Sequence, residues 1–149
     1  MRQLLVIFGF IALFAGIPAN AEIVSTEEAS QEMVLGKADA PVTVIEFSSM
    51  TCPHCAAFHN QTLPTIKKEY IDTGKVRLVS RDFPLDGLAL AASMVARCAG
   101  PSRYFGLIQV MFRTQERWAQ SSNPRGDLVS MARFAGMSEK DVDACLNNE

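Results

Sequence analysis

The sequence has 149 residues, which is enough for one domain with a hydrophobic core but not for two. Its 14 basic and 16 acidic residues give a formal charge of −2, and no basic stripe is present. This balance argues against a protein that binds nucleic acid through a charged surface, so no nucleic-acid partner is expected.

The first 21 residues have the pattern of a secretory signal peptide. Arg2 precedes an apolar run over residues 4–17, and Ala19-Asn20-Ala21 forms an A-x-A cleavage pattern. The alternative is a membrane anchor, but a membrane-spanning helix needs roughly 20 apolar residues. We therefore predict residues 1–21 as a signal peptide and residues 22–149 as a mature domain that is exported to the periplasm.

Three segments predict the strands of a redox half over residues 32–85. Met33-Val34-Leu35 is a short strand candidate, and Val42 to Phe47 is a nearly continuous apolar and β-branched run. Such a run is typical of a strand that is buried on both faces of a sheet. Residues 76–83 alternate apolar and polar side chains and predict another main strand.

Between the two main strands we predict a helix that begins at the Cys-Pro-His-Cys sequence of residues 52–55. Its apolar stripe consists of Leu63, Ile66 and Tyr70. Thr62 and Pro64 predict a break and restart of this helix, because proline removes a backbone donor. His59, one turn after Cys55, is expected to be a half-exposed helix residue.

From residue 86 onward the pattern is helical only. The sequence predicts four helical stretches, at residues 88–98, 104–112, 128–135 and 142–146. Gly100-Pro101 stops the first of them, and Ser138 with Asp141 resembles an acidic capping box before the last. The segments together predict an α/β fold, in which a β-α-β half carries an inserted helical bundle over residues 86–149.

Cys52, Pro53, His54 and Cys55 form a Cys-x-x-Cys pair between a strand and a helix. Unpaired N–H groups and the helix dipole favour negative charge at a first helical turn, so the pKa of Cys52 is expected to be lowered. Cys55, one turn further on, is close enough to close a disulfide but less accessible. Pro53 presets the turn, and His54 adds a hydrogen-bond donor beside the Cys52 thiolate. Each effect stabilises the reduced form, which makes the disulfide form a stronger oxidant.

Other uses of this motif fit the sequence less well. A zinc site built from Cys52, Cys55 and either histidine would need a fourth ligand, and no second pair has zinc spacing. A c-type haem site requires histidine directly after the second cysteine, where this chain has Ala56. A purely structural disulfide rarely spans so tight a loop at a strand-to-helix junction. We therefore predict redox chemistry that needs neither a metal nor a cofactor.

Glu46 lies within the apolar run of the second strand, where a carboxylate is costly to bury unless it has a partner or a task. It could move a proton to and from Cys55 during thiol exchange, helped by a pKa that burial raises. The alternative is a glutamate near the strand end whose side chain reaches solvent.

Cys98 and Cys145 lie on apolar helix faces, so both are expected to point into the helical region. In an oxidising compartment we predict that they form a structural disulfide. The alternative is two separate buried thiols, which are common in protein cores.

The sequence resembles the DsbA-like thiol oxidases of the thioredoxin-like superfamily. The resemblance rests on Glu46-Phe47, on the 52–55 motif followed by Phe58, and on the Arg-Asp-Phe-Pro-Leu sequence of residues 81–85. It covers residues 32–149 and implies that Cys52 is the attacking and attacked cysteine and Cys55 the resolving one. It also implies that His54 tunes the oxidising strength of the cysteine pair and that Glu46 is the buried acid near Cys55.

The same resemblance implies partners. The substrates would be reduced, unfolded exported proteins, and a membrane quinone-linked thiol oxidase would reoxidise the pair. A thioredoxin-like sheet also closes with a late β-hairpin, preceded by a cis-Pro loop that faces the redox pair. None of the later prolines precedes an apolar strand, so the closing hairpin and the cis-Pro loop are predicted to be absent. Such a chain, similar to the first two-thirds of a family member, is expected to react with small thiols but to hold substrate proteins poorly.

The predicted function is that of a periplasmic thiol–disulfide oxidoreductase that introduces disulfides into exported proteins. One alternative is a reductase or isomerase of the same superfamily, since the direction of exchange depends on reduction potential and partners. The other is a redox-silent binding chain that keeps the motif without turnover.

Overall fold

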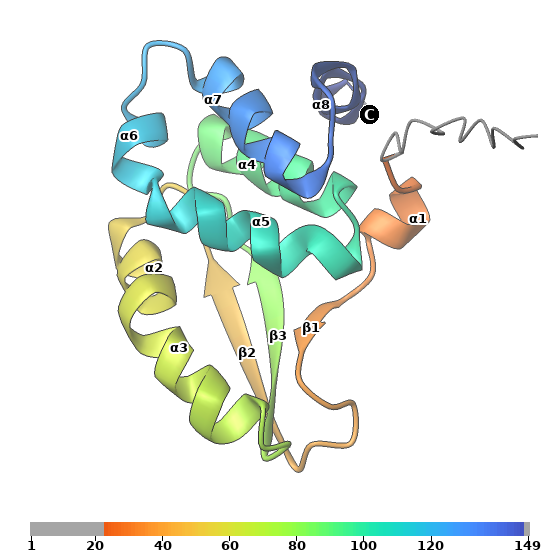
Figure 1. Ribbon diagram of the computed structural model, residues 1–149, viewed down its shortest axis with the longest axis vertical. Helices are drawn as coiled ribbons and strands as arrows, with labels where there is room; N and C mark the ends of the chain where they lie inside the picture. The colour runs from red at the N-terminus through yellow and green to blue at the C-terminus, as the bar shows by residue number, and fades with distance from the viewer. Residues whose placement is uncertain (1–22, 148–149) are drawn as a thin grey trace, which may run out of the picture.

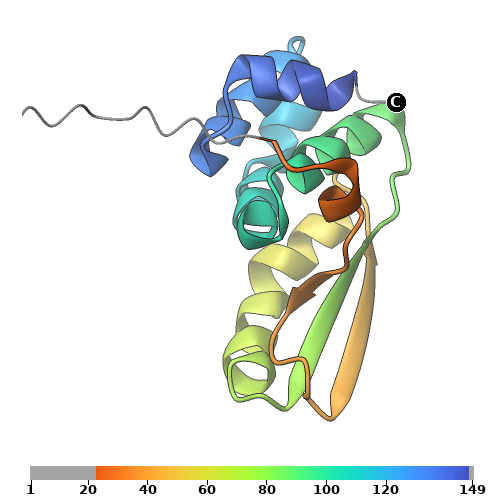
Figure 2. The same ribbon diagram turned by 90° about the vertical axis from the view of Figure 1, so that its right-hand side faces the viewer.

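The computed structural model describes residues 23–147, which form a three-stranded sheet with helices against one of its faces (Figures 1 and 2). The strands are β1 (Met33–Leu35), β2 (Val42–Ser48) and β3 (Val76–Asp82), in the order β1-β3-β2. β2 and β3 run parallel, with Val42 opposite Val76, and β1 pairs antiparallel with β3. The predicted signal peptide at residues 1–21 lies outside the described residues.

A long helical segment connects β2 to β3, and a group of helices follows β3. The connection comprises α2 (Pro53–Ala57), η1 (Phe58–Thr62), α3 (Leu63–Ile66) and η2 (Lys67–Ile71). The later helices are α4 (Gly87–Cys98), α5 (Pro101–Arg113), α6 (Gln115–Ala119), α7 (Pro124–Ala132), η3 (Arg133–Ala135) and α8 (Glu139–Leu146). A short helix, α1 (Thr26–Ala29), precedes β1. The predicted α/β order of strands and helices is confirmed, and α1 and α6 are two helices that the sequence pattern did not indicate. Within residues 23–147, no helix has the length and apolar character needed to cross a bilayer.

β2 is not buried on both faces, so the prediction from its apolar run is wrong. It lies at the edge of the sheet, and Figure 2 shows helices against only one face. Its exposed apolar side chains are Val42, Val44, Ile45 and Phe47. β3 occupies the centre instead, where Leu78 and Val79 are 1% and 2% exposed. A continuous apolar run therefore did not distinguish a central strand from an edge strand.

The helical segment between β2 and β3 is continuous, although Pro64 predicted a break. Two π-helical turns, η1 and η2, flank α3, and the N–H of Leu63 donates to the carbonyl of Phe58 five residues earlier. The wider turn accommodates Pro64, which has no N–H to donate. It also changes which side chains face inward: Ile71 is buried, whereas Tyr70, predicted in the apolar stripe, is 45% exposed.

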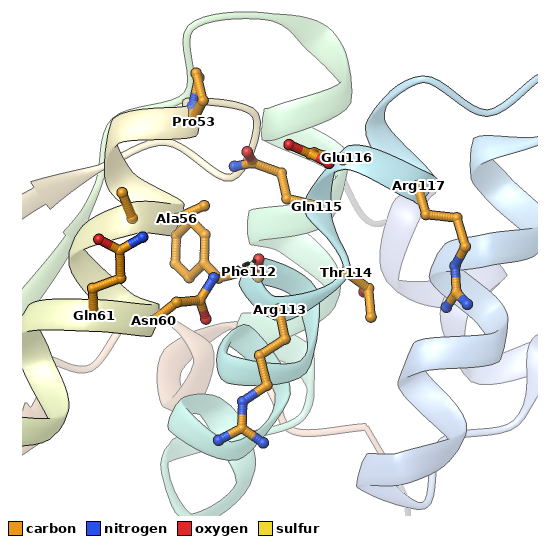
Figure 3. Close-up of a pocket in the computed structure, with 11 residues that line it drawn as sticks. Pro53, Ala56, Asn60, Gln61, Phe112, Arg113, Thr114, Gln115, Glu116 and Arg117 are labelled. Atoms are coloured by element: carbon orange, nitrogen blue, oxygen red, sulfur yellow. Dashed lines mark hydrogen bonds between the residues drawn. The ribbon is translucent and has the colours of Figure 1, made fainter.

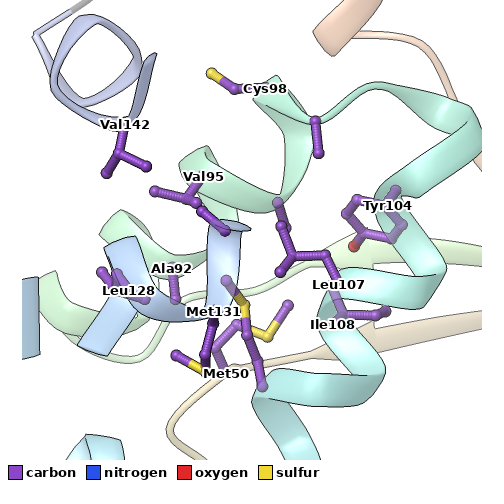
Figure 4. Close-up of a cluster of buried hydrophobic side chains, with 14 of the residues drawn as sticks. Met50, Ala92, Val95, Cys98, Tyr104, Leu107, Ile108, Leu128, Met131 and Val142 are labelled. Atoms are coloured by element: carbon purple, nitrogen blue, oxygen red, sulfur yellow. The ribbon is translucent and has the colours of Figure 1, made fainter. Parts of the chain in front are cut away.

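The main hydrophobic core lies among the helices that follow β3. Side chains of α4, α5, α7 and α8 pack together there, and Met50 from the loop after β2 joins them (Figure 4). Met33 from β1 belongs to the same cluster. A smaller cluster, formed by Leu63, Ile71 and Leu78, lies between the connecting helix and β3. The loop that leads into the Cys-Pro-His-Cys motif is therefore packed onto the helical core through Met50.

Two helix boundaries follow the signals in the sequence. α4 ends at Cys98, and Gly100 has a φ of 82°, where a Cβ would lie 2.7 Å from Cγ1 of Val24. At the start of α8, the Ser138 hydroxyl accepts from the N–H of Asp141, and the Asp141 carboxylate accepts from the N–H of Ser138. The predicted capping box is confirmed.

The structure joins Cys98 and Cys145 in a disulfide, with a Cα–Cα distance of 6.2 Å. Both side chains are buried, at 9% and 1% exposure. Cys98 ends α4 and Cys145 lies in α8, so the bond ties the last described helix to the first helix after β3.

Replacing Cys98 and Cys145 together with alanine should lower the free energy of unfolding by about 4 kcal/mol. The two residues are 47 positions apart, and in the chain-entropy model a loop of this length gives about that stabilisation. Urea denaturation followed by circular dichroism measures the difference. Full reduction of the unmodified chain should produce the same loss, whereas a double variant as stable as the unmodified chain would show that the bond does not stabilise the fold.

Candidate active site

Cys52 lies at the junction where β2 gives way to α2. Its backbone is extended, with φ of −78° and ψ of 119°, and it is the N-cap of α2, with Pro53 at the first helical position. Proline fits there because the first N–H groups of a helix have no partner within the helix. The N–H of Cys52 donates to the carbonyl of Ser49 at 3.1 Å, and its own carbonyl accepts from the N–H of Ala56 at 3.1 Å. The motif therefore forms the start of the helix.

The two thiols of the motif differ in pKa. The backbone N–H of Cys55 donates toward the sulfur of Cys52 and lowers the pKa of Cys52, and the Cys55 side chain and the N–H of His54 act in the same direction. Burial raises the pKa of the Cys55 thiol. Negative charge is thus favoured on Cys52 and disfavoured on Cys55.

The loop between β2 and α2 is held by the segment that follows β3. Thr51 Oγ1 donates to Asp86 Oδ2 at 2.7 Å, and the N–H of Leu85 donates to Ser49 Oγ at 3.3 Å. The bond from Thr51 lowers the pKa of Asp86. Asp86 also caps α4, because its Oδ1 accepts from the N–H of Ala89 at 2.7 Å. The start of the helical region is thereby fixed to the loop that carries the motif.

A buried glutamine from α6 holds the same loop. Gln115 is 5% exposed, and its Nε2 donates to the carbonyls of Met50 and Cys52, both at 2.9 Å. Figure 3 shows its side chain reaching toward the turn that carries Pro53, beside a cavity of about 560 Å³. The position of the first helical turn thus depends on a side chain that comes far later in the sequence.

Glu46 and His59 form a buried pair. Their side chains are 11% and 1% exposed, and His59 Nε2 lies 2.8 Å from Glu46 Oε1. The imidazole ring stacks on Phe112, with ring centroids 4.2 Å apart. The alternative that Glu46 reaches solvent is therefore wrong, and so is the prediction that His59 is half-exposed. The ring can be buried because its polar edge has a carboxylate partner and its face has an aromatic one.

Glu46, His54 and Cys55 line one cavity of about 370 Å³. The rest of its wall is apolar and consists of Val44, Ile45, Phe47 and Phe58. His54 itself is exposed. The structure thus brings three of the residues singled out in the sequence around one space at the start of α2. Within residues 23–147, no three His, Cys, Asp or Glu side chains gather as a potential metal site.

Sequence reasoning missed two side chains that hold the motif in place. Asp86 had a detectable signal, since an aspartate directly before a helical pattern is a preferred N-cap. Gln115 had none, because it lies outside every predicted helix and its contacts join segments that are distant in the chain.

Comparison with known proteins agrees with this arrangement. The sequence profile of the thioredoxin family matches residues 28–149. A Rickettsia conorii protein, provisionally named a protein-disulfide oxidoreductase, is 39% identical over 119 residues, which are 79% of this chain and 43% of that protein. Disulfide bond formation protein D of Bacillus subtilis is 34% identical over 104 residues, which are 67% of this chain and 47% of that protein. The chain spans less than half the length of both relatives.

Two solved structures are also similar. α-DsbA1 of Wolbachia pipientis superposes with a TM-score of 0.73 at 32% identity, covering 80% of this chain and 61% of that one. Oxidised BdbD of Bacillus subtilis superposes with a TM-score of 0.71 at 26% identity, covering 85% of this chain and 70% of that one.

Iodoacetamide should alkylate Cys52 of the reduced chain before Cys55, with a rate midpoint below the pH of about 8.5 that is ordinary for free cysteine. The reason is that N–H donors lower the pKa of Cys52 while burial raises that of Cys55, so thiolate forms first on Cys52 as pH rises. Peptide mapping across a pH series locates the label. Preferential labelling of Cys55, or a midpoint for Cys52 at the ordinary value, would contradict the prediction that Cys52 has the lower pKa of the two cysteines.

Gln115→Leu should lower the free energy of unfolding by about 1–3 kcal/mol, because the buried carbonyl of Met50 loses its side-chain donor and the carbonyl of Cys52 keeps only the bond from the N–H of Ala56. Gln109→Leu is the matched control: within the described part of the chain, the Gln109 side chain makes one hydrogen bond, an exposed one to Asn60, so its loss should cost about 0.5 kcal/mol or less. Urea denaturation of both variants measures the difference. Equal losses in the two variants would show that Gln115 does not hold the loop.

Proposed function

The chain belongs to the thioredoxin-like family, in its DsbA-like group, and on this premise we propose that it is a thiol–disulfide oxidoreductase that introduces disulfides into exported proteins. The observation that carries the proposal is the place of the Cys-Pro-His-Cys motif at the start of α2, with Cys52 as the N-cap and Pro53 at the first helical position. There, N–H donors lower the pKa of Cys52, and burial raises that of Cys55. A stabilised Cys52 thiolate favours the reduced motif, so the oxidised motif is a strong acceptor of electrons from substrate thiols.

The exchange proceeds in two steps at Cys52. A substrate thiolate attacks the sulfur of Cys52, the bond between Cys52 and Cys55 breaks, and Cys55 leaves with the electron pair and takes up a proton. A second substrate thiolate then attacks the substrate sulfur of the mixed disulfide, and Cys52 leaves as the stabilised thiolate. The substrate loses two electrons, and the motif gains them.

Glu46 is the proposed donor and acceptor of the Cys55 proton. Two observations support this role: Glu46 and Cys55 are lining residues of the same cavity, and Oε2 of Glu46 is buried without a hydrogen-bond partner among the described residues. A carboxyl group placed beside a thiol can supply a proton when the thiol leaves and remove it when the thiol attacks.

His54 and Pro53 are proposed to set the strength of the oxidant. Pro53 occupies the first helical position and fixes the turn, and the backbone N–H of His54 donates toward the Cys52 sulfur. The exposed imidazole of His54 adds a donor, and when protonated a positive charge, beside the thiolate.

The reaction is proposed to take place in the periplasm, with residues 1–21 as the export signal. The disulfide between Cys98 and Cys145 fits such a compartment, because disulfides persist where the environment is oxidising. The proposed substrates are reduced, unfolded exported proteins, and the proposed partner for reoxidation is a membrane quinone-linked thiol oxidase. Both suggestions come from the family resemblance.

The test is oxidative refolding of a reduced, disulfide-containing protein by the oxidised chain, followed by recovery of that protein's activity. Cys52→Ser should reduce the rate to that of buffer alone. His54→Ser should make the chain a weaker oxidant, lowering its reduction potential against glutathione by about 30–60 mV, which corresponds to a tenfold to hundredfold change in the exchange constant.

The reduction potential also separates an oxidase from a reductase. A value well above that of thioredoxin, about −270 mV, is expected for an oxidase. A value near or below it, or refolding that persists in Cys52→Ser, would overturn the proposal.

A further inference from the structure

The two oxygens of Glu46 have different surroundings. Oε1 lies 2.8 Å from Nε2 of His59, whereas Oε2 is buried and lacks a hydrogen-bond partner among residues 23–147. A buried carboxylate oxygen without a partner is costly, because it loses the hydrogen bonds that water would provide. Glu46 is nonetheless one of the residues that line the cavity beside Cys55.

The ring of His59 is fixed from three sides. It is 1% exposed, stacks on Phe112 with an interplanar angle of 25°, and meets the edge of Phe58 at 84° with ring centroids 5.7 Å apart. These contacts hold the ring with its Nε2 directed at Glu46 on β2. A carboxyl group with neither oxygen held would rotate readily about its last torsion, which has a broad and nearly two-fold profile.

We propose that His59 is a positioning residue for thiol exchange: it holds Oε1 of Glu46 so that Oε2 is the oxygen that exchanges a proton with Cys55. This inference rests on the proposed function and names a further residue of the same site. His59 does not touch the reacting sulfur atoms and acts only through Glu46.

The proton balance of each half-reaction follows. When substrate reduces the motif, Cys55 leaves with the electron pair of the broken S–S bond and takes the proton from Oε2, and the carboxylate that remains accepts from the N–H of His59. When the motif is reoxidised, Cys55 returns its proton to Oε2 and attacks Cys52 in the mixed disulfide, and the partner's sulfur leaves with the electron pair.

Among residues 23–147, few other titratable groups face this pair. Cys55 and His54 belong to α2 and line the same cavity as Glu46. β3 places Ser80 opposite Glu46, and α5 presents Phe112 to His59, so neither element adds a charge at these contacts. A substitution at His59 should therefore change the pH dependence of the Cys55 step through its contact with Glu46.

The experiment follows release of glutathione from a mixed disulfide between glutathione and Cys52, as Cys55 attacks it, across a pH series. His59→Leu should slow release about tenfold at acid pH, where removal of the Cys55 proton limits the rate, and change it little at alkaline pH, where solvent removes that proton. His59→Gln should restore release to within about threefold, because its amide can donate to Oε1. If His59→Leu does not fold, His59→Met, which keeps the volume and lacks the donor, replaces it.

Leu63→Ala is the matched control. Leu63 is a buried residue of the same helical segment, and its side chain cannot form a hydrogen bond with Glu46 or His59. This substitution should lower stability and leave the shape of the pH profile unchanged. A loss of rate in His59→Leu that is equal at every pH, or a His59→Gln variant as slow as His59→Leu, would overturn the inference in favour of a packing role. If the unmodified chain releases no glutathione, the proposed function fails as well; if it does and the variants share its profile, only this inference fails.

Discussion

The loop that precedes the first turn of α2 is held from outside the redox half. Gln115 donates to Met50 and Cys52, and Thr51 donates to Asp86, so residues up to 65 positions away fix the place where the helix begins. The N–H groups of that turn are consequently aimed at a single sulfur. The pKa difference between Cys52 and Cys55 depends on this orientation, because the same tetrapeptide without a fixed helix start would present no aligned donors.

The helical region is therefore part of the redox site and not an accessory to it. Its core includes Met50, from the loop before the motif, and α5 supplies the aromatic ring on which His59 lies. The disulfide between Cys98 and Cys145 ties α8 to α4, the helix that Asp86 caps. Asp86 therefore connects α4, which the disulfide ties to α8, with the loop that carries the motif.

Local signals in the sequence were sufficient for the motif at the start of a helix, for the capping box at Ser138 and for most later helices. These features depend on residues only a few positions apart. Contacts between distant segments were not accessible in the same way. The apolar run of β2 does not indicate that the strand lies at the edge of the sheet. The burial of His59 depends on Glu46 and Phe112, which come from two other elements. The contacts of Gln115 could not be predicted from the sequence for the same reason, since its partners lie in the other half of the fold.

The π-helical turns around Pro64 have a consequence for comparing this protein with its relatives. An α-helix advances about 100° per residue, so each wider turn displaces the following side chains by one position relative to an uninterrupted helix. This is why Ile71, and not Tyr70, meets Leu78. An alignment that places no gap in this segment against a relative with a regular α-helix would pair inward residues with outward ones. Single-residue insertions and deletions between Phe58 and Ile71 should therefore be weighed as changes of helix phase, and homologous core positions assigned only after that phase is known.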